Sequence, residues 1–152
     1  MIKVKDRAAI IKAKENLRRQ RKPLDSGRII AELNFGFWTS LLDSRYEQVL
    51  WPKLIKTCFS HMPNAMRTRK TLSKRFNRIR YLRNRIFHHE PVWYWQDLEQ
   101  QHREILEATA WIEPNLQALV MSVDRFPTTY QQGYAEIEQQ LRKFCLNATH
   151  KT

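Results

Sequence analysis

The chain of 152 residues carries 27 Lys and Arg against 15 Asp and Glu, a formal net charge of +12. A hydrophobic content of 42% and an aromatic content of 11% indicate a folded protein, and only three glycines argue against a turn-rich sandwich or barrel. The two cysteines form neither a disulfide framework nor a zinc motif, the N-terminus is too charged for a signal peptide, and no apolar run approaches the ~18 residues of a membrane span. We therefore expect one cytoplasmic, soluble domain over residues 1–152.

The charge is unevenly distributed along the chain. Residues 1–28 hold ten Lys and Arg against three acids, and residues 48–89 hold eleven with no acid at all. Residues 90–152 reverse the sign, with nine acids against five basic residues. A domain with a strongly basic half attracts polyanions by Coulomb steering and counterion release, so a nucleic acid is the expected partner.

The first half of the chain predicts three helical elements. Residues 6–22 form a basic helix, which Pro23 ends. Residues 28–42 are apolar around most of a helical circumference, which is typical of a central helix or a subunit interface. A third helix follows and restarts at Trp51–Pro52, before a loop at 61–66.

The second half begins with a long helix over residues 67–89, which ends before Pro91. An amphipathic helix at 96–112, a short helix at 114–124, a loop at 126–134 and a last helix at 134–146 complete the chain. The expected fold is all-α, a bundle of about five or six helices without a sheet. It consists of a basic N-terminal helix (1–24), a core (25–115) and C-terminal helices (116–152).

The long helix combines an apolar stripe with a polar line. The stripe recurs at spacings of four, three, three and four, through Leu72, Phe76, Ile79, Leu82 and Ile86. The polar line shares another face at ~100° per residue, through Asn77, Tyr81, Asn84 and His88. Such a line is either a solvated helix face ending in a histidine near the helix C-terminus, or a site that binds phosphate and moves protons.

The segment "LRNRIFHHEP" (82–91) resembles the Arg–Asn–x3–His motif of Abi-like proteins in the HEPN superfamily. Upstream, "GRIIAELNFGFWTSLLDSRYEQVLW" (27–51) is similar to the helix pair that precedes this motif in those proteins. The similarity extends over about residues 25–115 and implies a HEPN-like helical bundle.

The resemblance implies a homodimer that acts as a metal-independent endoribonuclease without a cofactor. Such proteins are often toxins or abortive-infection effectors of antiviral defence, sometimes restrained by a protein or RNA antitoxin. Carried onto this chain, Arg83 and His88 are catalytic and Asn84 is the polar residue beside the arginine. Neutral His88 would take the proton of an RNA 2′-hydroxyl, while Arg83 would stabilise the charge of the attacked phosphate.

The helical spacing places Arg83 and His88 ~140° apart on a regular helix, with Arg83 inside the apolar stripe. One interpretation makes Arg83 a structural arginine paired with a buried carboxylate such as Glu32 or Glu107. Two others keep it catalytic: the helix distorts or ends near His88, or a two-fold dimer joins two motifs in one composite active site. We favour the dimer.

Further residues of this basic region are expected to bind the RNA backbone. They are Arg67, Arg69, Lys70, Lys74, Arg78, Tyr81, Arg85 and His89. No metal site is expected at His88, His89 and Glu90, because adjacent helical residues diverge. Some HEPN toxins carry a tyrosine two residues after the motif histidine, which a nucleotidyltransferase antitoxin modifies, but this chain has Glu90 there.

The aromatic cluster Trp93, Tyr94 and Trp95 follows the motif, and we expect it to pack in the core rather than to stack unpaired bases. Two other functions stay open on the same residues. The chain could be a non-catalytic nucleic-acid-binding helical module, or a structural domain in which the motif only ends a helix and organises a dimer.

Overall fold

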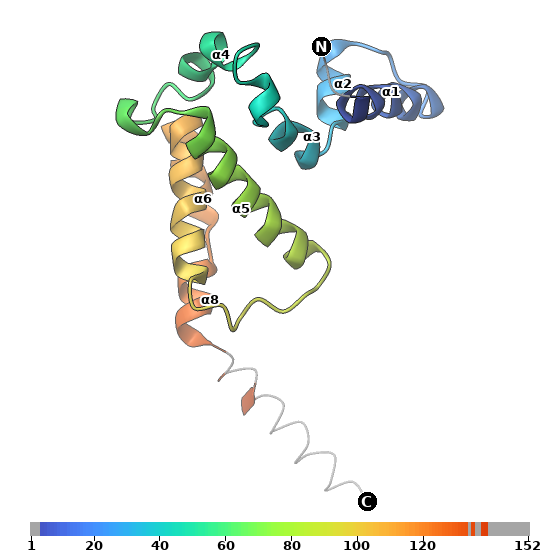
Figure 1. Ribbon diagram of the computed structural model, residues 1–152. Coiled ribbons are helices and arrows are strands. Elements are labelled where there is room, and N and C mark those ends of the chain that lie inside the picture. The colour runs from blue at the N-terminus through green and yellow to red at the C-terminus, as the bar shows by residue number, and fades with distance from the viewer. Residues whose placement is uncertain (1–3, 134, 136–137, 140–152) are drawn as a thin grey trace, which may run out of the picture.

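The computed structural model describes residues 4–133, 135 and 138–139, which contain eight α-helices, two short 3₁₀ turns and no strand (Figure 1). This confirms the all-α fold, with more helices than the five or six expected. The expected last helix at 134–146 lies almost wholly outside the described residues. The helices are α1 (Val4–Arg19), α2 (Ser26–Glu32), α3 (Phe35–Ser40), α4 (Trp51–Cys58), α5 (Arg69–Phe87), α6 (Leu98–Ile112), α7 (Pro114–Val123) and α8 (Phe126–Gln132).

The predicted helix over 28–42 is wrong, because the chain breaks between α2 and α3. Leu33 adopts an extended backbone conformation, and the Asn34 side chain accepts a hydrogen bond from the Phe37 backbone N–H at 2.9 Å. This is the contact that an N-cap residue makes, so Asn34 starts a new helix where the apolar pattern suggested a continuous one. The break turns the start of α3 toward α5.

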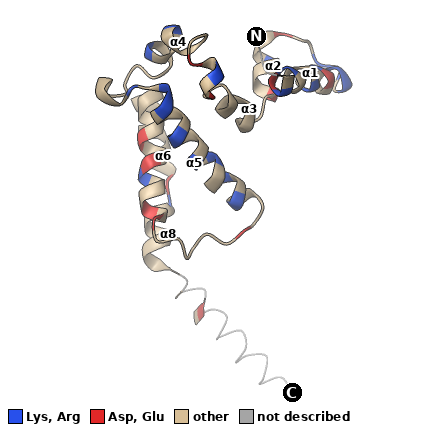
Figure 2. Cartoon of the chain, viewed as in Figure 1, with Lys and Arg blue, Asp and Glu red and all other residues tan. Residues whose placement is uncertain are grey.

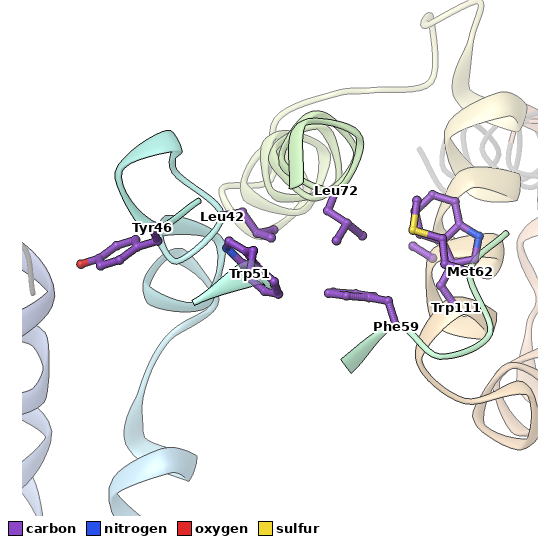
Figure 3. Close-up of a cluster of buried hydrophobic side chains, with 8 residues drawn as sticks. Leu42, Tyr46, Trp51, Phe59, Met62, Leu72 and Trp111 are labelled. Carbon is purple, nitrogen blue, oxygen red and sulfur yellow. The ribbon is translucent and has the colours of Figure 1, made fainter. Parts of the chain in front are cut away.

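The main hydrophobic core lies where the start of α5 meets the end of α6, and Figure 3 shows its side chains. The 3₁₀ turn η1 (Ser44–Tyr46), α4 and the loop after α4 contribute to it, together with one half each of α5 and α6. The expected restart at Trp51–Pro52 is confirmed, since Pro52 occupies the first turn of α4. The buried side chains are Leu42, Tyr46, Trp51, Phe59, Met62, Leu72, Ala108 and Trp111.

Helix α5 connects this core to the motif. It lies between α3 on one side and α6 on the other, and α6 in turn packs on α7 (Figure 1). The N-terminal half of α5 contributes Leu72 to the core, but beyond it only Leu82 is buried. Ile86, the last residue of the predicted apolar stripe, is 51% exposed, so the stripe continues past the core that it was expected to cover.

The predicted loop at 126–134 is mostly helical, as α8. Asp124 accepts a hydrogen bond from the Phe126 backbone N–H at 2.9 Å, and Pro127 occupies the first turn. Proline is tolerated there because its missing N–H would be unpaired in any case. Gly133 ends the helix with a positive φ of 58°.

Candidate functional site

The motif occupies the last turns of α5, and its final residues form the helix C-terminus. The Glu90 backbone N–H donates to the Arg85 carbonyl at 2.9 Å, and the His89 N–H donates to the Ile86 carbonyl at 3.0 Å. These two bonds make a Schellman motif, with His89 in the left-handed conformation at φ 56°. One of the two arrangements that would keep Arg83 catalytic was a helix that ends near His88. The structure has this ending, because α5 ends at Phe87 and His88 is the C-cap.

A cavity of about 400 Å³ lies between the start of α3 and α5, and we call it the motif groove. Four of its lining residues are polar side chains of α5, and Tyr81 borders it. Gly36 lines the opposite wall, where an added Cβ would approach Asn34 Oδ1 to 3.2 Å. The lining residues are Asn34, Phe35, Gly36, Asn77, Arg80, Tyr81, Arg83 and Asn84.

A second cavity of about 410 Å³ adjoins the motif groove and shares Asn77 and Arg80 with it. Its acidic side chains are Asp6 and Asp43. Asp6 is 3% exposed and accepts hydrogen bonds from Ser40 Oγ at 2.6 Å and from Tyr46 Oη at 2.7 Å. These bonds tie α1 to the elements beside the groove. The two acids thus line a cavity that Arg80 also lines, whereas Arg83 lines only the motif groove.

Arg83 is exposed at the motif groove and is not the structural arginine of the alternative interpretation. Its Nη1 donates to Asn84 Oδ1 at 3.2 Å, and its guanidinium lies 3.8 Å from the centre of the Phe87 ring. The two carboxylates considered as partners have other donors: Glu32 accepts from Asn16 at 2.9 Å, and Glu107 accepts from Arg75 at 2.6 Å. The interpretation of Arg83 as part of a buried ion pair is therefore wrong.

His88 lies one turn beyond Asn84, and its backbone N–H donates to the Asn84 carbonyl at 3.0 Å. Its side chain is exposed and does not line the motif groove. A single chain thus places Arg83 and Asn84 at one cavity and leaves His88 just outside it.

Four of the predicted RNA-binding arginines make contacts within the fold. Arg67 donates to the carbonyls of Met62 and Ser60, and Arg69 donates to the Leu42 carbonyl at 2.8 Å. These two hold the loops around the core, and Arg69 Nε also lies 3.2 Å from Glu47 Oε2. Both guanidiniums are therefore occupied in the folded chain.

The other two arginines, Arg78 and Arg85, form ion pairs and lie on the side of α5 that faces α6. Arg78 pairs with Asp97 and with Glu104, the latter at 3.1 Å, and Arg85 pairs with Glu90 at 2.9 Å. Figure 2 shows that α5 carries basic residues along its length and that the neighbouring α6 carries acidic ones. Arg78 thus pairs with acids at the start of α6 and within it, whereas Arg85 pairs with an acid just after its own helix.

The remaining predicted RNA-binding residues are exposed: Lys70, Lys74, Tyr81 and His89. Arg80 was missed by the sequence analysis, although it lies three residues after Asn77 and four before Asn84, which is the helical spacing of one face. Among the described residues, neither Arg80 nor Arg83 pairs with a carboxylate. Asn34 was also missed, because only the break before α3 brings it to the groove.

The expected packing of the aromatic cluster is wrong for two of its three members. Trp93 is 65% exposed and Tyr94 is 54% exposed, with their rings edge to face at 5.8 Å. Trp95 is half-buried and stacks on Tyr81, with ring centroids 5.7 Å apart and planes 10° from parallel.

Hydrogen bonds from Gln101 and then Arg78 hold the pKa of Asp97 below its usual value, against the effect of desolvation. After α7, the Phe126 backbone N–H and His102 of α6 likewise lower the pKa of Asp124. Both aspartates are therefore ionised at neutral pH and keep their partners in place.

No family model, no curated protein and no solved structure matches this chain. None of the described helices is long and apolar enough to cross a membrane.

Proposed function

We propose that this protein is a metal-independent endoribonuclease of the HEPN type, acting in the cytoplasm as a toxin or phage-defence effector. The observation that carries the proposal is the motif groove. In it, Arg83 and Asn84 stand beside Arg80, and neither arginine pairs with a carboxylate in the described part of the chain. Arginines left open at a polar cavity are suited to bind the phosphates of a nucleic acid.

The side chains of the motif suit cleavage through the RNA 2′-hydroxyl. The neutral imidazole of His88 accepts the proton of that hydroxyl, whose oxygen attacks the adjacent phosphorus. The bond from phosphorus to the 5′-oxygen then breaks, and that oxygen takes a proton from water, while His88 later returns its own proton to the solvent. The products are a 2′,3′-cyclic phosphate and a 5′-hydroxyl. Arg83 and Arg80 stabilise the negative charge of the transition state.

A dimer supplies the geometry that one chain lacks, because His88 lies outside the groove formed by its own chain. Within the motif itself, between Asn84 and His88, Ile86 and Phe87 are 51% and 65% exposed, although both are apolar. A second copy that covers these residues would bring its own motif to the same place and form a composite site. A protein or RNA antitoxin is a further partner that could cover the same surface.

The test is incubation of the purified protein with total RNA in the presence of excess EDTA. We expect the wild type to cleave RNA to cyclic-phosphate ends and to leave single-stranded DNA intact. His88→Ala should lose at least 100-fold in cleavage rate, about the contribution of a general base, while it retains most RNA affinity. His61→Ala, which changes an exposed histidine outside the motif, is the matched control and should cleave normally.

The second candidate is a non-catalytic nucleic-acid-binding module, and the position of His88 outside the groove favours it. It predicts that the wild type binds RNA and cleaves none. A strict requirement for added metal would contradict the HEPN-type mechanism. If the protein binds neither RNA nor DNA at moderate salt, both nucleic-acid functions are excluded, and the remaining interpretation is a structural dimerisation domain.

A further inference from the structure

A third cavity, of about 390 Å³, lies on the other side of Tyr81 from the motif groove. We call it the aromatic pocket, and Tyr81, Arg85, Tyr94, Trp95 and Gln101 are among its lining residues. Tyr81 lines both cavities. A ligand group in the aromatic pocket would therefore be separated from the motif groove by a single side chain.

The aromatic pocket presents stacked rings. Tyr81 and Trp95 lie nearly parallel, with centroids 5.7 Å apart, and the Arg85 guanidinium is 5.5 Å from the Trp95 ring. Tyr94 is 54% exposed at the same pocket. Flat aromatic surfaces combined with a guanidinium are the groups on which unpaired nucleobases stack.

Two buried polar atoms of the pocket residues have no hydrogen-bond partner in the part of the chain that the structure describes. Gln101 is 6% exposed, and its amide donates to Asp97 Oδ1 at 3.0 Å. Because an ionised carboxylate only accepts, the donating atom is the amide nitrogen, and Gln101 Oε1 is the atom that lacks a partner. Arg85 Nε also lacks one. Buried polar atoms without partners are rare, and two of the three within the described residues belong to this pocket.

The charges of the aromatic pocket favour a base over a phosphate. Its two arginines are already paired, Arg78 with Asp97 and Glu104, and Arg85 with Glu90. The pocket therefore combines apolar faces and unpaired hydrogen-bonding atoms with little free positive charge. The groove on the other side of Tyr81 holds the unpaired arginines instead.

We propose that the aromatic pocket binds an unpaired nucleobase of the RNA strand whose phosphate occupies the motif groove. The base stacks on the Tyr81–Trp95 pair, and an N–H group on its Watson–Crick edge donates to Gln101 Oε1. The identity of the ligand as RNA rests on the proposed function, whereas the pocket and its unpaired atoms do not. The site makes the protein selective for single-stranded or loop RNA, because a paired base cannot offer its Watson–Crick edge.

The test uses 2′-O-methyl pentanucleotides, which cannot be cleaved through the 2′-hydroxyl, with binding measured by fluorescence anisotropy. One oligonucleotide carries adenine, and the other carries purine, which lacks the exocyclic amino group and has no N–H on that edge. We expect the adenine strand to bind about three- to tenfold more tightly, the range of one net hydrogen bond. Gln101→Met should remove this preference without weakening the purine strand.

Gln100→Met is the matched control, because Gln100 is exposed on the same helix and does not line the pocket. It should keep the preference for adenine. Trp95→Leu should weaken both strands about tenfold or more through lost stacking. Equal affinity of the wild type for both strands would overturn the proposal, and so would a preference that survives Gln101→Met. If the preference is found but natural RNA is not cleaved, the base site stands and the ribonuclease proposal falls.

Discussion

Two residues with a positive φ, Arg21 and His89, end helices without a glycine. Each occupies the C′ position of a Schellman motif, closed by Lys22 N–H to the Leu17 carbonyl and by Glu90 N–H to the Arg85 carbonyl, both at 2.9 Å. Glycine is common there because a Cβ is strained in the left-handed conformation. His89 directly follows His88, the motif histidine. Backbone strain that is retained beside a candidate site points to a functional role for the residue.

His89→Gly should raise the free energy of unfolding by about 1 kcal/mol, because it removes the strain of the Cβ. Urea denaturation measures this change. Arg21→Gly, at the same position of a motif outside the groove, should stabilise the protein by a similar amount. If His89 also contacts RNA, His89→Gly will bind RNA more weakly despite its greater stability. Unchanged or lower stability of both variants would contradict the assignment of strain.

Helix α5 has two basic sides with different roles. On the α6 side, Arg75 is 14% exposed and contacts Glu104, Glu107 and the Trp111 ring. On the α3 side, Arg80 lines the motif groove without a carboxylate partner among the described residues. The first kind of arginine holds two helices together, and the second is available to an anion.

Arg75→Met and Arg80→Met separate these roles. Arg75→Met should lower the free energy of unfolding by about 2 kcal/mol, since it leaves the largely buried Glu104 without one of its partners. Arg80→Met should change stability by less than about 0.5 kcal/mol. It should instead reduce the slope of log affinity against log salt by about 1, which an RNA titration at several salt concentrations measures. A stability loss at Arg80 equal to that at Arg75 would contradict the division.

At the scale of the whole molecule, the main core includes the start of α5, and the motif lies at the end of the same helix. Helix α5 spans roughly 28 Å at 1.5 Å per residue, and its last turn extends beyond the core. In the described residues, 18 large hydrophobic side chains are exposed against 12 buried hydrophobic ones. That much uncovered apolar surface favours association, and Ile86 and Phe87 place part of it within the motif.

Ile86→Asp should convert the proposed dimer to a monomer and abolish cleavage, because it places a charge in the apolar contact that joins the two motifs. Sedimentation velocity at micromolar concentration measures the change in mass. Leu54→Asp alters another partly exposed apolar residue, on α4, and should leave mass and cleavage unchanged. A wild-type protein that is monomeric under these conditions would contradict the composite site.

Proline positions and hydrophobic periodicity predicted most helices correctly. They failed at two places where a side chain accepts a hydrogen bond from a backbone N–H at the start of a helix. Proline and the period of apolar residues marked α1, α4, α5, α6 and α7. Asn34 is the N-cap of α3 and breaks the apolar run over 28–42, and Asp124, one residue before the N-cap of α8, accepts the Phe126 backbone N–H in the expected loop at 126–134. Each side chain satisfies a backbone N–H within the next few residues, a local contact that hydrophobic periodicity does not report.

The sequence by itself determined that the fold is all-α and that α5 carries both a polar line and the Arg83, Asn84 and His88 motif, because helical period and charge are properties of neighbouring residues. Only the tertiary structure decided which basic residues are available. Packing against α6 occupies Arg75 and Arg78, whereas the start of α3 leaves Arg80 and Arg83 open at a groove. The reason is that an ion pair depends on which helix lies opposite, and the partners of Arg75 and Arg78 on α6 are 32 and 26 positions away in the chain, so these pairs form only after folding.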